Sequence, residues 1–276
     1  MKKKRKFSVS VLILVLVLIL FTVPFYIMLT GSLKNNSALE LKPPDFNIFK
    51  NVSLRSYVEA FSTRPIWRWI SNSVIAAVSV GVINVFVAAM AGYIFARRRT
   101  PVLKALFAVV IATMILPQTM LLIPNYLVAT KLNLRDSMIG LVLTSVNPAY
   151  GVFLCRQYMI SLPNELFEAA ELDGCSELAK FFRIAVPLSW PAFGSLFIFT
   201  FLGIWNDFLW QSIMMTSKDN MTLAMGIQSL LTSGSDIRKY SLQFAVSTFS
   251  MLPVFLLFFS CQKAFIKGIT AGSIKG

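Results

Sequence analysis

The sequence contains no histidine and only three cysteines among its 276 residues. Without histidine there is no Ser/His/Asp or Cys/His set, which argues against a hydrolytic active site. Cys155, Cys175 and Cys261 lack the spacing of a zinc site or a disulfide framework, so we predict no metal site and interpret them as small apolar fillers. The sequence also has no GxxxxGK[ST] loop. We therefore predict no catalytic residue, no cofactor bound by this chain and no enzymatic activity.

Acidic residues are scarce as well, with 12 Asp and Glu against 26 Lys and Arg. Five of these acids lie in residues 161–187, which we call the acidic hairpin: Glu165, Glu168, Glu171, Asp173 and Glu177. The net charge of +14 is no signal for nucleic acid here. In a chain with long apolar runs, basic residues at helix ends contact lipid headgroups and set the topology.

Several runs of roughly 18–25 residues carry few charges, and each is long enough to cross a bilayer as a helix. We predict an all-α polytopic membrane protein with one permease domain, residues 9–265, between a basic N-terminus, residues 1–8, and a tail, residues 266–276. The six predicted spans are residues 9–30, 71–96, 102–129, 137–159, 192–210 and 242–265.

Basic residues predict the orientation of these spans. Residues 2–6 are all Lys or Arg, and a second basic group lies at 97–104. Cytoplasmic loops are enriched in such residues, so we place both termini and the acidic hairpin in the cytoplasm. The first span resembles a signal peptide, but its apolar run is long and no Ala-x-Ala site follows, which favours an uncleaved helix. The basic residues of the long 32–70 loop weaken the contrast between the two sides.

Several of the spans contain prolines. Pro117 and Pro124 lie in the third, Pro148 in the fourth and Pro253 in the sixth. A kinked helix needs neighbours or water to satisfy its freed carbonyl groups. The third span therefore either lines a cavity or carries a static kink. Asn147, a polar residue at membrane depth, is predicted to face protein or water rather than lipid.

The acidic hairpin is predicted to be two short helices broken at a glycine. Pro163 suits a first helical position, and Glu165 complements the dipole of the first turn. Gly174 permits the positive-φ backbone that ends such a helix. Ser176 is a candidate cap for the second helix, and Pro187 is expected to stop it. An amphipathic hairpin of this kind suits docking by a partner, but an ordinary cytosolic loop with a helical turn fits the spacing equally.

The hairpin residues Glu168-Ala169-Ala170, Asp173-Gly174, Phe181, Ile184 and Pro187 resemble the EAA loop of bacterial ABC-importer permeases. The departures are small, with Cys175 where Ala is usual and Val186 where Leu is usual. The wider pattern is similar to carbohydrate-uptake permeases of the maltose-transport type. It rests on Asn72-Ser73, Gly92-Tyr93, Ala96-Arg97, Pro117, Ile123-Pro124, Trp205-Asn206-Asp207-Phe208, Gly268-Ile269-Thr270-Ala271-Gly272 and Lys275-Gly276.

This resemblance implies the type I importer permease fold in a bacterial cytoplasmic membrane. It also implies a second, usually non-identical permease subunit, two ATPase subunits that use ATP and Mg, and an extracytoplasmic binding protein that delivers a sugar. No nucleic acid is implied. The hairpin would be the coupling helix seated on the ATPase, and its residues would be Glu168, Ala169, Ala170, Asp173, Gly174, Ile184 and Pro187.

The resemblance also bears on the tail and on residues 212–241. The tail, with Gly268, Gly272 and Lys275, would reach toward the ATPase interface, although a solvated tail is the alternative. The 212–241 loop resembles the segment that contacts the binding protein in relatives. Residues of a suitable type for a sugar pathway are Asn147, Tyr150, Trp205, Asn206 and Asp207. Asp207 could instead simply cap a helix at the outer interface.

Other classes of protein remain as alternatives. A secondary transporter would carry buried charged groups at mid-membrane, and the first four predicted spans and the sixth have essentially none. A membrane enzyme is disfavoured because no catalytic set is present. An ABC permease for amino acids, phosphate or metals is a further alternative, and the Trp205–Phe208 signature and the tail favour a sugar over these. A glycerol phosphate or modified sugar stays open as the substrate within the carbohydrate group.

Overall fold

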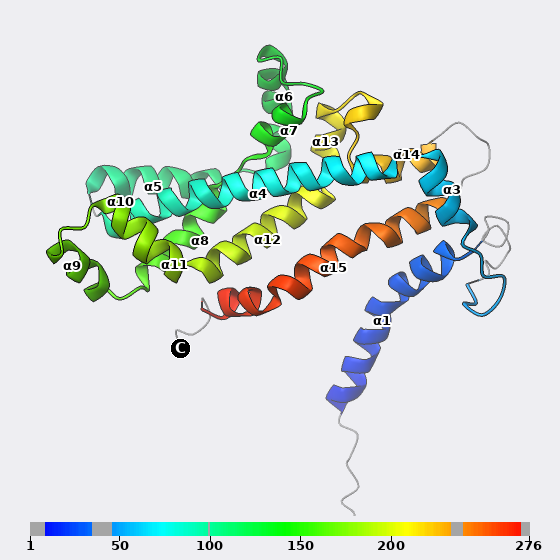
Figure 1. Ribbon diagram of the computed structural model, residues 1–276, viewed down its shortest axis with the longest axis horizontal. Coiled ribbons are helices and arrows are strands. Elements are labelled where there is room, and N and C mark those ends of the chain that lie inside the picture. Colours follow the sequence, from blue (N-terminus) through cyan, green and yellow to red (C-terminus); the bar gives the residue numbers. More distant parts are fainter. Residues whose placement is uncertain (1–8, 35–45, 99, 233–239, 272–276) are drawn as a thin grey trace, which may run out of the picture. The chain divides into compact units, whose positions relative to one another are not determined.

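The computed structural model describes residues 9–34, 46–98, 100–232 and 240–271, with side chains described for 11–34, 46–98, 100–230 and 240–260. The regular elements in these ranges are all helical (Figure 1). They are α1 (Val9–Ser32), α3 (Arg55–Thr63), α4 (Ile66–Arg97), α5 (Pro101–Thr113), η1 (Gln118–Leu121), α6 (Leu122–Lys131), α7 (Met138–Ser145), α8 (Ala149–Ile160), α9 (Glu165–Leu172), α10 (Glu177–Lys180), η2 (Phe181–Ala185), α11 (Val186–Leu188), α12 (Trp190–Asn206), α13 (Leu209–Met214), η3 (Lys218–Asn220), α14 (Leu223–Thr232) and α15 (Tyr240–Ala271).

The chain divides into two compact units. The first comprises residues up to Trp67 together with Gly226–Leu252. Within it, the rings of Phe61, Trp67 and Phe249 meet pairwise with centroids 4.9 to 5.7 Å apart. Edge and tilted ring contacts of this length are favourable, so the cluster fastens α3 to the first residues of α4 and to α15.

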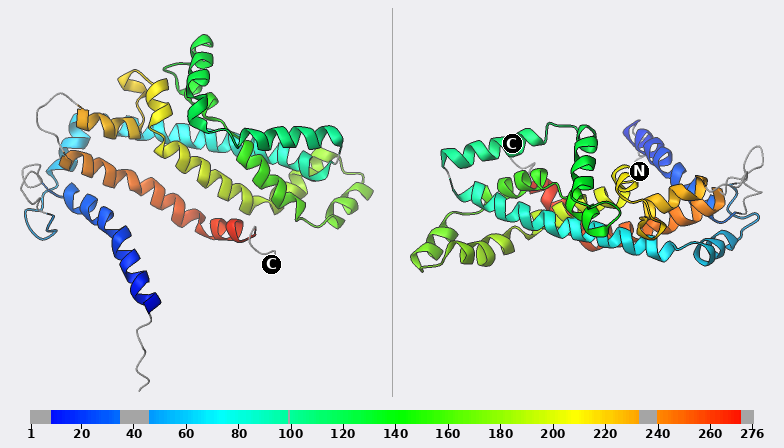
Figure 2. Two further views of the ribbon diagram at one scale, coloured as in Figure 1. Left: turned by 180° about the vertical axis from the view of Figure 1, so that it is seen from behind. Right: turned by 90° about the horizontal axis from the view of Figure 1, so that it is seen from above.

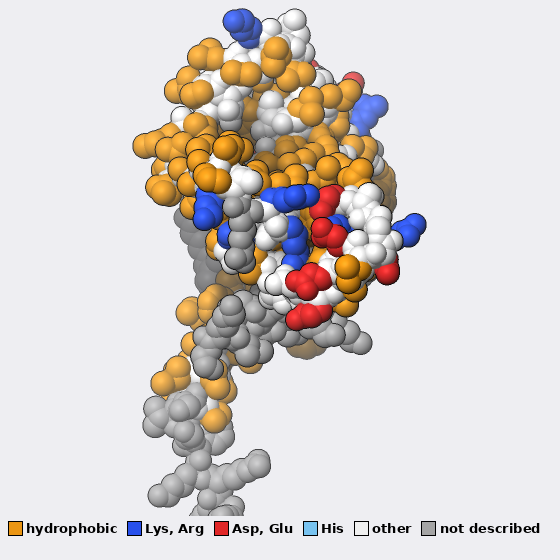
Figure 3. Space-filling model, turned by 90° about the vertical axis from the view of Figure 1, so that its left-hand side faces the viewer, with side chains coloured by type: hydrophobic (Ala, Val, Ile, Leu, Met, Phe, Trp, Pro, Cys, Tyr) orange, Lys and Arg blue, Asp and Glu red, His pale blue; other side chains and the backbone are white. Residues whose placement is uncertain are grey.

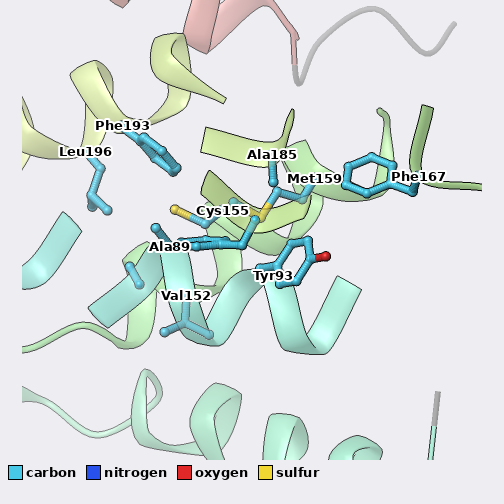
Figure 4. Packing of buried hydrophobic residues seen from close by; sticks show 11 residues of the cluster. Ala89, Tyr93, Val152, Cys155, Met159, Phe167, Ala185, Phe193 and Leu196 are labelled. Carbon is cyan, nitrogen blue, oxygen red and sulfur yellow. The ribbon is translucent and has the colours of Figure 1, made fainter. Parts of the chain in front are cut away.

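The second unit comprises Arg68–Met225 together with the residues from Pro253 onward. Its core is an apolar cluster between α4, α8 and α12, to which the acidic hairpin adds Phe167, Phe181 and Ala185 (Figure 4). Small residues let these helices approach closely. A Cβ atom on Gly92 would lie 2.7 Å from Cys155 Cβ and 2.9 Å from the backbone nitrogen of Arg156, which leaves no room for a side chain.

Three helices are long and apolar enough to cross a membrane: Val11–Ser32, Ile66–Arg97 and Tyr240–Ser260. Three bent helix pairs also qualify if each pair is one span, which gives up to six spans among the described residues. The prediction of six spans is compatible with this count. The largest bend in the three pairs is 93°, between α5 and the segment from η1 to α6. Figure 2 shows these long and broken helices from two further sides.

The third and fourth spans, predicted as helices with internal prolines, are each divided into two helices. The third breaks between Thr113 and Gln118, and the fourth bends by 52° between Ser145 and Ala149. Proline lacks a backbone N–H and forces the residue before it out of the helical region. Helices α5 and α7 end four and three residues before Pro117 and Pro148, and each proline is the cap residue of the next helix, which runs in another direction.

The predicted ends of the fifth and sixth spans were also displaced. Helix α12 stops at Asn206 because Asp207 has an extended backbone (φ −73°, ψ 105°), and α13 follows as a separate helix. Helix α15 passes through Pro253 unbroken and continues to Ala271, so the tail predicted from residue 266 begins as helix. Gly268 lies in this helix, while Gly272 and Lys275 lie outside the described residues.

Candidate functional site

The acidic hairpin begins with α9 and turns at a glycine, as predicted. Gly174 has a φ of +74°, a conformation that residues with a Cβ rarely adopt. The N–H of Cys175 donates to the carbonyl of Ala170 at 2.9 Å, and that of Gly174 donates to the carbonyl of Glu171 at 3.0 Å. This pair of bonds is a Schellman motif, and it satisfies carbonyl groups that the helix end would leave unpaired.

Ser176 caps the next helix, which confirms the prediction. Its backbone is extended, and its Oγ accepts a hydrogen bond of 3.2 Å from the N–H of Ala179. The start of the hairpin differs from the prediction, because Pro163 precedes the cap residue Asn164 and the first helical residue is Glu165. Both turns of the hairpin are thus fixed by local hydrogen bonds.

Pro187 does not stop the second helix, so that prediction was wrong. A π-helical turn, η2, leads directly into α11, where Pro187 lies in the first turn. Proline lacks the N–H of a regular helix bond, and the helical segment ends one residue later, at Leu188. The chain changes direction only at Ser189, where the axis bends by 74° into α12. Ile184 is half-buried against the apolar cluster, and Pro187 is exposed.

The two faces of α9 differ in exposure. Phe167 and Ala170 are buried in the core of the unit. Glu165, Glu168, Ala169 and Leu172 follow the spacing of a single helix face, and all four are exposed. Leu172 has 90% of its surface exposed, next to the exposed Asp173. Figure 3 shows acidic side chains gathered at this end of the unit beside Lys and Arg side chains.

Arg97, at the end of α4, binds residues at the start of the hairpin. Its Nη1 donates to Asn164 Oδ1 at 2.7 Å, and its Nη2 donates to the carbonyl of Met159 at 3.0 Å. Its guanidinium carbon also lies 3.6 Å from the centroid of the Phe167 ring. One side chain therefore joins α4, the end of α8 and the start of α9 through charge-assisted and cation–π contacts.

Lys180 forms a second anchor. It is only 5% exposed, and its Nζ lies 3.1 Å from Glu171 Oε2 and 2.9 Å from Glu177 Oε1. Glu177 also pairs with Arg98 at 3.2 Å and accepts a hydrogen bond of 3.2 Å from the Tyr93 hydroxyl. Glu171 and Glu177 are therefore used inside the hairpin through their contacts with Lys180.

We expect Arg97→Ala to loosen the hairpin while the rest of the unit stays folded. The variant loses two hydrogen bonds made by a charged group, which contribute about 2 kcal/mol together with the ring contact. Hydrogen exchange of the α9 amides, read by mass spectrometry, should become roughly 30-fold faster. Arg183→Ala removes an exposed cation of the same hairpin and should leave the exchange unchanged. Equal effects of both substitutions would contradict this role of Arg97.

The predicted pathway residues do not form one cluster. Asn147 is exposed at the break between α7 and α8, and the Tyr150 ring meets Phe199 of α12 edge-on at 6.4 Å. Trp205 is buried and stacks on Phe201 at 5.6 Å. Asn206, exposed at the end of α12, donates to the carbonyl of Leu202.

Asp207 has a structural role in the fold. Its Oδ1 accepts a hydrogen bond of 3.1 Å from the N–H of Trp210, so it caps the start of α13. This is the simpler of the two interpretations offered by the sequence. Trp210 in turn donates from Nε1 to Thr144 Oγ1 at 3.1 Å, which ties α13 to α7.

The known proteins that resemble this chain are consistent with a fold of broken helices and an exposed hairpin. The family model described as binding-protein-dependent transport system inner membrane component matches residues 85–271, more than half of the chain. The chain belongs to this family. The prediction of an ABC-importer permease is thereby confirmed, and the secondary-transporter alternative loses its support.

Individual relatives agree with the family assignment of this inner membrane component. It is 35% identical over 259 residues to the arabinooligosaccharides transport system permease protein AraQ of Bacillus subtilis, covering 93% of this chain and 92% of that protein. It is 29% identical over 252 residues to the sn-glycerol-3-phosphate transport system permease protein UgpE of Escherichia coli K12, covering 89% of each.

The fold also matches a solved structure. A chain from the crystal structure of a bacterial ABC transporter involved in the import of the acidic polysaccharide alginate superposes with a TM-score of 0.84. The identity is 18%, and the match covers 93% of this chain and 95% of that one. This likeness confirms the predicted all-α importer permease fold.

Residues 212–232 of the inner membrane component are more ordered than the predicted loop, since they contain α13, η3 and α14. Asp136 holds part of this region. Its Oδ1 accepts bonds of 3.0 and 3.1 Å from the N–H groups of Thr216 and Ser217, and further bonds come from the Ser217 hydroxyl and the Asn220 amide. Together these bonds lower the pKa of the Asp136 carboxyl from 3.8 to about 2, and the bond from the Ser217 backbone has the largest effect.

We expect Asp136 to make stability depend on pH. Because its pKa is lower in the folded chain, its contribution is complete above about pH 4 and is lost as the pH falls toward about 2. Asp136→Asn keeps a side chain that tolerates the positive φ of 51° but cannot titrate. The difference in thermal unfolding midpoint between wild type and variant, measured in detergent, should shrink between pH 5 and 3. A constant difference would contradict the assignment.

Proposed function

We propose that this chain is the permease subunit of an ATP-driven importer that moves a carbohydrate inward across the cytoplasmic membrane. Its similarity to a permease for arabinooligosaccharides over 93% of its length supports a sugar or oligosaccharide as the substrate. The fold it shares with an importer of alginate is compatible with the same substrate class.

The proposed coupling site is the exposed face of α9. The observation that carries it is the contrast between Phe167 and Ala170, buried in the core, and Glu168 and Leu172, turned to the outside. An exposed carboxylate one turn from a nearly fully exposed leucine suits a partner surface with a basic group and an apolar pocket. Ala169 is small enough for close approach.

This proposal gives the chain several partners. Two ATPase subunits would dock on the hairpins of this chain and of a second, homologous permease, in a heterodimer embedded in the lipid bilayer. An extracytoplasmic binding protein would deliver the sugar. The chain itself would bind no cofactor and catalyse no reaction, because ATP and Mg would be used by the ATPase subunits. Both termini would lie in the cytoplasm, with the end of α15 and the tail near the ATPase.

Transport would be driven through contacts that differ between two states of the ATPase pair. A ligand or partner can shift a conformational equilibrium only by its differential affinity for the two states. A hairpin held by Arg97 and Lys180 transmits such a difference without bending. Asn147, Tyr150 and Asn206 are exposed and remain our proposed pathway residues, whereas the role proposed for Trp205 would require it to leave its stack on Phe201.

A second candidate substrate is glycerol phosphate. It is favoured by the 29% identity to the sn-glycerol-3-phosphate permease over 89% of both chains. Such a substrate carries a negative charge that an oligosaccharide of neutral sugars lacks, so the two candidates can be separated by uptake measurements.

The test is a purification of this chain from its native cell in mild detergent, followed by reconstitution of the captured complex into liposomes. We expect an ATPase and a second permease to copurify, and uptake of labelled oligosaccharide to require the binding protein and ATP. Uptake of glycerol 3-phosphate alone would replace the sugar with the second candidate. Transport by this chain alone without ATP would overturn the proposal.

A further inference from the structure

A cavity of about 350 Å³ lies beside the hairpin, among the end of α4, the start of α5 and the end of α8. None of its described lining residues belongs to the coupling face of α9 or to the proposed sugar pathway. Three of the lining residues are cations, namely Arg98, Lys104 and Arg156, and none of the described ones is an acid. The cavity therefore attracts anions.

The three cations differ in the contacts that they already make within the chain. Arg156 donates from Nε to the carbonyl of Phe95 at 3.2 Å, which fixes its side chain and uses one of its five N–H groups. Arg98 is 60% exposed and pairs with Glu177 through Nη2. Lys104 is exposed on the second turn of α5. The arrangement suits a phosphate group, which accepts several charge-assisted hydrogen bonds at once.

The remaining walls of the cavity are apolar. Phe95, Leu103 and Phe107 line it, and the Phe107 ring lies 4.2 Å from the guanidinium carbon of Arg156. Helix α5 has no buried residue along its 13 positions, so apolar surface runs on from the cavity toward mid-membrane. A free phosphate ion makes no use of such walls, whereas the glycerol backbone and acyl chains of a lipid would cover them.

We propose that this cavity binds the phosphate of an anionic glycerophospholipid from the cytoplasmic leaflet. The leaflet follows from the orientation given under the proposed function. Basic pockets between membrane helices on the cytoplasmic side are suited to anionic headgroups. The bound phosphate would meet Arg98 on the side away from Glu177, so that the lipid would lie next to the ion pairs that hold the hairpin.

The test uses the full chain purified in mild detergent and native mass spectrometry, with phosphatidylglycerol, phosphatidylcholine or inorganic phosphate added. We expect one phosphatidylglycerol to be retained and phosphatidylcholine to be lost. The double variant Arg98→Gln with Lys104→Gln should bind phosphatidylglycerol roughly 30-fold more weakly, because each cation removed weakens binding about fivefold. The matched control, Lys131→Gln with Arg183→Gln, removes two exposed cations elsewhere and should bind normally.

Several outcomes would overturn the proposal. Equal retention of phosphatidylcholine, or equal loss of binding in the control variant, would show that no specific anion site exists. Displacement of the lipid by millimolar inorganic phosphate would assign the cavity to a free anion instead. Protection of Lys104 from amine labelling only when the ATPase is bound would make the cavity a partner surface. Because lipid retention is read without transport, its failure is distinguishable from failure of the proposed importer function.

Discussion

Glu168→Lys should separate the importer from its ATPase. The substitution places a cation on the exposed face of α9, where the proposed partner offers a basic group. Reversing one charge of a desolvated interfacial pair costs about 3 kcal/mol or more, equivalent to roughly a 100-fold weaker association. We expect the ATPase to be lost from the complex during purification, and ATP-dependent uptake to fall by a similar factor. The isolated chain should keep its thermal unfolding midpoint.

Glu165→Lys provides the matched control for this experiment. It makes the same charge change one turn earlier on the same exposed face. A smaller loss than for Glu168→Lys would support a specific contact at Glu168, and equal losses would reduce the effect to general charge attraction. Wild-type assembly and uptake in the Glu168 variant would exclude α9 as the docking helix.

Gly92→Leu is expected to disrupt the packing between α4 and α8. The first added carbon would lie 2.7 Å from Cys155 Cβ and 2.9 Å from the backbone nitrogen of Arg156, and backbone cannot move aside cheaply. Overpacking of this kind costs about 3 kcal/mol or more. We expect a lower thermal unfolding midpoint in detergent, and a hairpin that is cleaved more readily by added protease.

Gly203→Leu is a suitable control, because nothing lies within 4 Å of the Cβ position at Gly203 in α12. Replacing glycine by leucine inside a helix favours the helix by about 1 kcal/mol. The isolated control variant should therefore be at least as stable as the wild type. A similar destabilisation in both variants would mean that the close approach at Gly92 is unimportant.

Local features of the hairpin could be predicted from the sequence because they depend on neighbouring residues only. Gly174 supplies the positive φ, and Ser176 caps the helix three residues before the N–H it binds. Both rules act over one turn of the chain. The apolar runs likewise predicted helices of spanning length, although not their exact ends.

The geometry at the prolines could not be predicted in the same way. A proline shows where the hydrogen-bond ladder is interrupted, but the direction of the next helix depends on what it packs against. Pro253 leaves α15 continuous, while the chain at Pro117 turns by 93°. Two apolar residues directly precede each of these prolines, so the immediate sequence does not distinguish a kink from a break.

The anchors of the hairpin were missed because they join residues far apart in the sequence. Arg97 lies 67 positions from Asn164. The sequence shows Lys180 only as a basic residue within an acidic segment. A signal existed in each case. Arg97 is the last residue of a long apolar run, and Lys180 follows Glu177 by three positions, a spacing that permits an ion pair on one helix face.

The length of α4 determines how far a tilt of this helix moves its hairpin end relative to its other end. This helix has 32 residues, or about 48 Å at 1.5 Å per residue. Its C-terminal end is bonded to the hairpin through Arg97, and Asn72 near its other end donates to the carbonyl groups of Asp219 and Met221. If α4 tilts as a stiff rod by only about 5°, one end moves about 4 Å relative to the other. A small tilt of α4 would therefore move the 215–223 segment by about 4 Å relative to the hairpin.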